Sequence, residues 1–156
     1  MTIWSVMRMS KCLVLFVEGE TEIEFYKQVV AHVRKLHPQG MFDTNIEYKC
    51  IKGIGGFKNE VLRKFVKDIK TKYKNDCVFK VVLCRDTDVF EFSQKPPVRW
   101  NEVEKALLEN GAAEVIHVEA CHCIEDWFLY DADGIISFLR LNKKTKVSGK
   151  SGYEKL

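Results

Sequence analysis

An unbroken apolar run at residues 13–17 (LVLFV) constrains this chain most, because acidic residues follow it at once. A run of five apolar residues is short for a helix and is typical of a strand buried on both faces. Residues 78–84 form a second strand-like segment, rich in valine, which acidic residues also follow. Strands covered on both faces occur in parallel sheets flanked by helices. The two segments therefore predict the centre of an α/β sheet.

Strand-like and helix-like segments alternate along the whole chain. We expect strands at 11–17, 46–51, 78–84 and 115–120, and helices at 21–36, 57–73, 102–110, 124–130 and 133–139. This order predicts a mostly parallel, doubly wound, Rossmann-like sheet of about four strands flanked by helices. In the first helix, Thr21 is placed to cap the start, and one apolar face is expected to meet the core. That face consists of Tyr26, Val29, Val30 and Val33.

Size and composition indicate an ordinary globular protein. The 156 residues favour a single domain, with its core at about 11–140 and a basic tail at 142–156. No apolar stretch approaches the roughly 18 residues that span a bilayer, and no cleavable leader pattern opens the chain. We therefore expect a cytoplasmic protein with no membrane contact and with its six cysteines reduced.

The net charge of +3 permits nucleic-acid binding without arguing for it strongly. Basic residues crowd the segment 58–74 and the tail. Lys58, Arg63, Lys67 and Lys150 are candidates to hold a nucleic-acid backbone. A solvated helix face and an exposed chain end explain the same pattern, so both interpretations stay open.

Two acidic clusters follow the two apolar segments: Glu18-Gly19-Glu20-Thr21-Glu22 and Asp86-Thr87-Asp88. Carboxyl ends of parallel strands meet at one edge of a sheet, where ligands bind. Asp86 and Asp88 are alternate residues and are expected to face the same way. Carboxylate oxygens suit Mg²⁺ or Mn²⁺, which makes a metal-dependent phosphoryl-transfer site the leading hypothesis.

Simpler explanations exist for each acidic cluster. A helix start favours carboxylates and would explain Glu22, whereas a polar loop would explain the aspartate pair. Glu18 fits these explanations less well, because a carboxylate directly after a buried strand needs a partner. Gly19 is expected to allow a tight turn there. Arg85 is expected either to neutralise local charge or to contact a phosphate.

Two further segments carry candidate site residues. Glu125 precedes the apolar Trp127-Phe128-Leu129, which would anchor it near the end of the fourth strand, although helix capping also explains it. Gly53, Gly55 and Gly56 lead into the second helix. A phosphate site at that helix start and a plain connecting loop both remain open.

The motifs together resemble the Toprim domain of topoisomerases, DnaG-type primases and OLD-family nucleases. The resemblance rests on Val17-Glu18-Gly19-Glu20-Thr21-Glu22 with Phe25-Tyr26, on Asp86-x-Asp88, and on the E-x-W-F-L-x-D segment at 125–131. The last element is similar to that of small bacterial Toprim-like proteins of the DUF4276 group. The resemblance covers residues 11–140.

The resemblance implies roles for these residues. Glu18 would be a metal ligand or the general acid/base, and Asp86 and Asp88 would hold Mg²⁺ (or Mn²⁺). Glu22 and Glu125 would complete one or two metal positions. Lys150 is a candidate for the lysine that assists the chemistry in the family.

The implied function is a Mg²⁺-dependent nuclease that hydrolyses phosphodiester bonds of DNA or RNA, in bacterial anti-phage defence. The alternative is a non-catalytic Toprim-fold module that binds a partner ATPase or a phage component, since the chain contains no ATPase motif of its own. An acidic α/β nuclease fold of the PIN or NYN type is a third interpretation. A homodimer also stays open.

Overall fold

The computed structural model describes residues 9–39, 43–74, 76–87, 98–121, 123–138, 140 and 142. The chain divides into two compact units. The first comprises Met1–Cys84 and Pro97–Val118, and the second comprises Arg85–Pro96 and Glu119–Leu156. That the whole chain is a single domain stays a prediction.

A four-stranded, all-parallel sheet forms the centre of the fold, in the order β2-β1-β3-β4. Its strands are β1 (Ser10–Val17), β2 (Thr44–Cys50), β3 (Cys77–Asp86) and β4 (Ala112–Ala120). Phe16 of β1 lies opposite Leu83 of β3, and Val17 lies opposite Cys50 of β2. The two apolar segments are thus the central strands, and the predicted fold class is confirmed.

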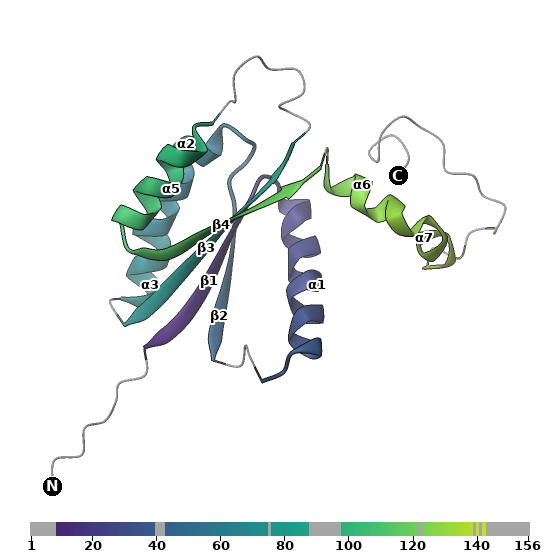
Figure 1. Cartoon of the computed structure of the whole chain (residues 1–156), viewed down its shortest axis with the longest axis horizontal. Helices are drawn as coiled ribbons and strands as arrows, with labels where there is room; N and C mark the ends of the chain where they lie inside the picture. Colours follow the sequence, from purple (N-terminus) through teal and green to yellow (C-terminus); the bar gives the residue numbers. More distant parts are fainter. Residues whose placement is uncertain are drawn as a thin grey trace, which may run out of the picture. The chain divides into compact units, whose positions relative to one another are not determined.

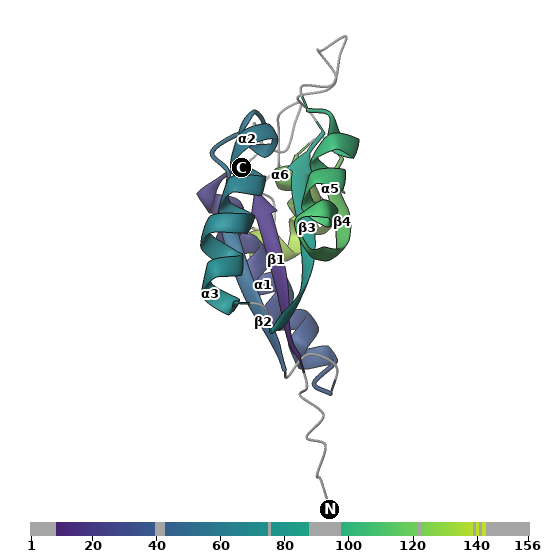
Figure 2. The ribbon, with the colours of Figure 1, turned by 90° about the vertical axis from the view of Figure 1, so that its left-hand side faces the viewer.

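Helices cover both faces of the sheet in the first unit (Figures 1 and 2). On one side lies α1 (Glu20–Leu36), and on the other lie α2 (Gly56–Lys64), α3 (Thr71–Tyr73) and α5 (Trp100–Glu109). A π-helical stretch, Phe65–Lys70, joins α2 to α3. The second unit contains α6 (Ile124–Phe128), a 3₁₀ turn (Leu129–Asp131) and α7 (Ala132–Phe138). No helix in the described part of the chain is long and apolar enough to cross a membrane.

The main core lies between the sheet and the helices α2 and α5. Alternate strand residues face it, as the two-residue period of a strand requires. The rings of Phe65 and Phe79 meet edge-on, with their centroids 5.5 Å apart. The buried members include Cys12, Val14 and Phe16 of β1, Phe79, Val81 and Leu83 of β3, Phe57, Val61, Phe65 and Ile69 of the α2 segment, and Leu107 of α5.

The opposite face of the sheet carries α1, and here two predictions were wrong. Tyr26 is buried as expected, but Val29 and Val33 are 39% and 37% exposed. Val33 lies two turns after Tyr26 on the same side of the helix, so this side is buried at Tyr26 but partly open to solvent at Val33. Thr21 does not cap the helix: α1 begins at Glu20, Gly19 is the N-cap, and no side chain caps it.

A polar cluster fastens α3 to β2. The hydroxyl of Tyr73 donates to Oε1 of Glu47 (2.5 Å), and Nζ of Lys72 lies 2.5 Å from the same oxygen. Burial raises the pKa of Glu47, but the hydrogen bonds from Lys72 and Tyr73 outweigh burial and hold that pKa below its usual value. Burial and the same bond raise the pKa of Tyr73. The ionised carboxylate therefore stabilises this corner of the fold.

Candidate functional site

Glu18 follows β1 directly, and its backbone is fastened to the loop after β2. Its carbonyl oxygen accepts hydrogen bonds from the N–H of Gly53 (2.9 Å) and the thiol of Cys50 (3.5 Å). One residue earlier, the carbonyl of Val17 accepts the N–H of Ile51 (2.8 Å). These bonds join two loops at the carboxyl edge of the sheet. The half-buried Glu18 side chain therefore projects from a fixed backbone.

Glu22, one turn into α1, folds back onto this loop. Its Oε2 accepts the N–H of Glu18 at 3.0 Å, so the carboxylate closes the turn that leads into the helix. Gly19, between them, has φ −126° and ψ 166°, an extended conformation open to any residue. A Cβ on Gly19 would lie 3.4 Å from Oε1 of Glu22. The backbone angles at this position therefore do not require glycine, because the chain is extended there.

The charge of Glu22 acts on Cys84 near the end of β3. Burial raises the pKa of the Cys84 thiol to about 12; a hydrogen bond with Tyr26 lowers it, and the negative charge of Glu22 raises it. Cys84 precedes Asp86 by two residues and lies on the strand that pairs with β1. Within the first unit, the acidic turn after β1 therefore lies near the end of β3.

In the second unit, Asp86 is the last residue of β3 and is half-buried. Arg85 before it is only 6% exposed and forms an ion pair with Glu119 of β4. The N–H of Thr87 donates to the carbonyl of Ala120 (3.0 Å). A buried guanidinium paired in this way neutralises local charge, which is one of the two roles expected of Arg85. The other role, contact of Arg85 with a phosphate of nucleic acid, stays a prediction.

Glu125 lies in the first turn of α6 and is half-buried. Burial raises the pKa of the Cys123 thiol, and the hydrogen bond that this thiol donates to Glu125 raises it further. The N–H of Asp126 donates to the carbonyl of Cys123 at 3.1 Å and begins the helix. Glu125 therefore contacts the side chain that immediately precedes its own helix, and both its metal role and the capping alternative stay predictions.

The candidate carboxylates fall into two groups. Glu18 and Glu22 belong to the first unit, and Asp86 and Glu125 belong to the second. Asp88 lies outside the described residues, as does Lys150. Among the described residues, no group of three or more His, Cys, Asp or Glu is arranged to hold a metal ion. The donors are all carboxylate oxygens, the chemistry that Mg²⁺ and Mn²⁺ prefer.

Many basic side chains of the segment 58–74 hold the fold together. Lys58 and Lys67 are exposed, which fits both a solvated helix face and a surface that binds a polyanion, so their role with nucleic acid stays a prediction. Four others contact partners within the fold. These are Arg63 with Glu60 (2.6 Å), Lys64 with the carbonyl of Cys50 (3.0 Å), Lys70 with the carbonyl of Asn110 (2.7 Å), and Lys72 with Glu47 (2.5 Å).

The structure adds Lys52 to the candidate residues. It follows β2, it is exposed, and its φ of 60° lies in the left-handed region that few side-chain-bearing residues adopt. Gly53, next to it, has φ 96° and donates its N–H to Glu18. Strained backbone of this kind clusters at functional sites. The sequence indicated only a glycine-rich loop, because it does not report the backbone angle of Lys52.

Comparison of the chain with models of protein families, with curated proteins and with solved structures found no match. The Toprim resemblance therefore stays a prediction that rests on the motifs at Glu18, Asp86 and Glu125.

Proposed function

We propose that this protein is a Mg²⁺-dependent nuclease of Toprim type that hydrolyses phosphodiester bonds in DNA or RNA. Glu18 and Glu22 from the turn after β1, and Asp86 and Asp88 from the end of β3, would hold the ion. Glu125 would complete its surroundings. Mn²⁺ would substitute for Mg²⁺, because both accept the same oxygen ligands.

One observation supports the proposal most. The charge of Glu22 raises the pKa of Cys84, which lies two residues before Asp86. Strands β1 and β3 are parallel neighbours, so their carboxyl ends share an edge of the sheet. Within the first unit the acidic turn after β1 thus lies near Cys84, and that Asp86 and Asp88 share an ion with this turn is the proposal itself.

The chain's own residues supply most of the requirements of the reaction. The ion, when bound, would stabilise charge on the scissile phosphate and activate water. Glu18, on a backbone fixed by Gly53 and Cys50, would act as ligand or as general acid/base from a preorganised position. Exposed Lys58 and Lys67 would bind the phosphodiester backbone without reading its sequence.

Cleavage assays with matched carboxylate variants test the proposal. We expect Glu18→Gln and Asp86→Asn to lower Mn²⁺-dependent cleavage of DNA or RNA by about 100-fold or more, as the loss of a charge-stabilising group does elsewhere. Glu102→Gln is the control, because Glu102 is 64% exposed on α5 and pairs only weakly with Arg99. Calorimetric Mn²⁺ titration should show weaker binding in the first two variants. Undiminished cleavage by Asp86→Asn would defeat the proposal.

A second candidate, a non-catalytic module that binds a partner ATPase, is favoured by one feature of the site. The Glu22 carboxylate holds the backbone N–H of Glu18, and the Arg85 guanidinium pairs with Glu119, so both groups already serve the fold. A purified chain that binds Mn²⁺ but cleaves neither DNA nor RNA, alone or with an added ATPase, would select this function.

A further inference from the structure

Lys52 lies in the loop between β2 and α2, and hydrogen bonds fix the chain on both sides of it. Before it, the N–H of Ile51 donates to the carbonyl of Val17 (2.8 Å). After it, the N–H of Gly53 donates to the carbonyl of Glu18 (2.9 Å). Both carbonyls belong to the end of β1 and the acidic turn that follows it. The side chain of Lys52 therefore starts from a fixed backbone position beside Glu18.

The loop itself does not require a lysine at this position. With φ 60°, Lys52 adopts the left-handed conformation, in which a residue with a Cβ is strained and glycine is not. Gly53, with φ 96°, adopts a similar conformation at the next position. Lys52 is also exposed, so its side chain adds nothing to the core. The part of Lys52 that can have a role is therefore its ammonium group.

The ammonium group of Lys52 forms no hydrogen bond or ion pair with another described residue. Its charge is felt by Glu60 on α2. The hydrogen bond from Arg63 lowers the pKa of Glu60, and the charge of Lys52 adds to this effect. Arg63 binds this carboxylate directly, with 2.6 Å between Nη2 and Oε2. The ammonium group of Lys52 thus remains accessible to an anion from solution.

Negative charge gathers at the same edge of the sheet. Glu18, Glu20 and Glu22 place three carboxylates within residues 18–22, in and after the turn that follows β1. Like charges repel, so these carboxylates oppose the approach of a phosphate. A bound ion would offset part of this repulsion, and a cation fixed close to Glu18 would offset more of it. Lys52 is an exposed cation that the backbone holds beside this turn.

We propose that the ammonium group of Lys52 binds a phosphate of the nucleic-acid strand, beside the phosphodiester bond that is cleaved at Glu18. This role rests on the nuclease function proposed above, and it makes Lys52 a substrate-binding residue. An ammonium group binds phosphate as a point charge, and such a contact carries no sequence information. Because the backbone of Lys52 is fixed to the turn that carries Glu18, the contact holds the strand close to the reacting bond.

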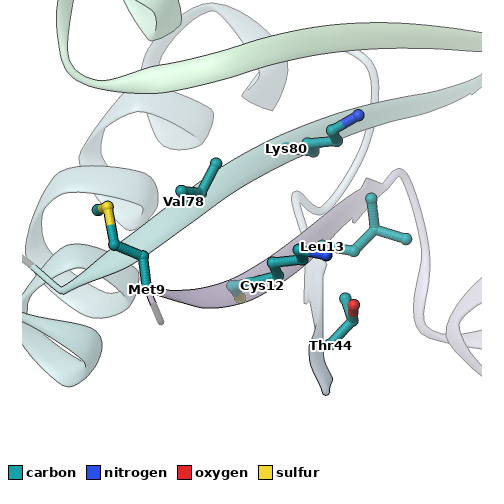
Figure 3. A pocket seen from close by; sticks show the side chains of 7 residues that line it. Met9, Cys12, Leu13, Thr44, Val78 and Lys80 are labelled. Carbon is teal, nitrogen blue, oxygen red and sulfur yellow. The ribbon is translucent and has the colours of Figure 1, made fainter. Parts of the chain in front are cut away.

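A control lysine lies at the opposite edge of the sheet. Lys11, near the start of β1, lines a hollow of about 650 Å³ together with Met9, Thr44 and Lys80 (Figure 3). Six residues separate Lys11 from Val17, which places the two about 20 Å apart along the strand. Lys11 is exposed, as Lys52 is. Lys11→Ala therefore removes the same charge far from the acidic turn.

Fluorescence anisotropy with a labelled DNA strand, and with an RNA strand of the same sequence, tests the contact. Ca²⁺ replaces Mg²⁺ in the binding buffer, since it also takes oxygen ligands. Lys52→Ala should raise the dissociation constant by about tenfold, as the loss of a hydrogen bond to a charged group does. It should also reduce the slope of log K against log salt by about 0.7, the value for one phosphate of a single strand. Lys11→Ala should keep the wild-type slope.

Two further variants separate binding from folding. Lys52→Arg keeps the positive charge and should retain most of the binding. Lys52→Gly should bind as weakly as Lys52→Ala but unfold at a higher temperature, because only glycine adopts this conformation without strain. Binding that follows the stability of the variants, and not their charge, would overturn the contact.

Cleavage kinetics with Mn²⁺ distinguish failure of this role from failure of the proposed function. Lys52→Ala should raise KM and leave kcat nearly unchanged, because a contact made equally to substrate and transition state contributes only to binding. If the wild type cleaves but Lys52→Ala and Lys11→Ala bind with equal slopes, the role of Lys52 is overturned and the nuclease function stands. If the wild type cleaves neither strand while Lys52→Ala alone loses a phosphate contact, the contact is supported and the nuclease function is overturned.

Discussion

Replacing Gly56 by alanine tests whether the loop that fastens Glu18 has room for one more carbon atom. Gly56 begins α2, and a Cβ there would lie 2.2 Å from both the carbonyl oxygen and Cγ2 of Ile51. Non-bonded carbon contacts normally settle at about 3.5–4.0 Å. Ile51 is 2% exposed, and its N–H is bound to Val17 of β1, so it cannot move aside easily.

The expected cost of this substitution follows from the contact. An extra atom forced into a packed site costs about 1–3 kcal/mol, and a clash with backbone belongs to the upper half of that range. For a chain of this length, each kcal/mol lowers the midpoint of thermal unfolding by about 2–4 °C. We therefore expect Gly56→Ala to lower the free energy of unfolding, measured in urea, by about 2–3 kcal/mol. Its midpoint of thermal unfolding should fall by about 4–12 °C.

The adjacent glycine supplies the control. Gly55 has φ −62° and ψ −24°, and a Cβ there would meet nothing within 4 Å. Gly55→Ala should therefore keep wild-type stability or gain about 0.4–1 kcal/mol, because alanine restricts the unfolded chain. If Gly56→Ala unfolds at the wild-type urea concentration, or if both variants lose equally, the packing argument is wrong.

Two further predictions concern buried polar groups. Tyr73→Phe removes the hydrogen bond to Glu47 and should lower the free energy of unfolding by about 1–2 kcal/mol at neutral pH. Tyr48→Phe, on the same strand as Glu47, should lower it by less. Folding lowers the pKa of Glu47, so the ionised carboxylate contributes fully to stability above its unfolded pKa of about 4.3. This contribution is lost as the pH falls through the folded pKa. The difference in unfolding free energy between wild type and Tyr73→Phe should therefore shrink in urea titrations at acid pH. The thiol of Cys84, with a pKa of about 12, should resist iodoacetamide in the folded protein while exposed Cys121 reacts, as mass spectrometry of the labelled peptides will show. Equal labelling of the two would contradict the burial of Cys84.

The order of strands and helices could be predicted because its determinants are local. The run at 13–17 and the segment at 78–84 became the central strands, as unbroken apolar runs do in parallel sheets. The exposure of Val29 and Val33 could not be predicted. Periodicity shows which side of a helix is apolar, but it does not show how much of that side the sheet covers.

The candidate site was predictable only in part, because it depends on contacts between distant residues. The motif identified Glu18, but its bonds with Gly53 and Cys50 depend on the register of β1 and β2. The pairing of Arg85 with Glu119 likewise depends on how β3 lies beside β4. A shared ion between Glu18 and Asp86 stays a prediction that the metal titration addresses.

The internal contacts of the lysine-rich helices affect how the protein would meet a polyanion. Lys64 and Lys70 each cap a backbone carbonyl, and Lys72 neutralises Glu47, so these ammonium groups already have oxygen neighbours. Nucleic acid carries condensed counterions, and each phosphate that a lysine or arginine neutralises releases some of them, which drives attachment. The electrostatic attraction felt by a phosphate backbone would therefore come mainly from the exposed lysines without such neighbours, which are Lys52, Lys58, Lys67 and Lys74, and added salt would weaken it less than a count of the basic residues suggests.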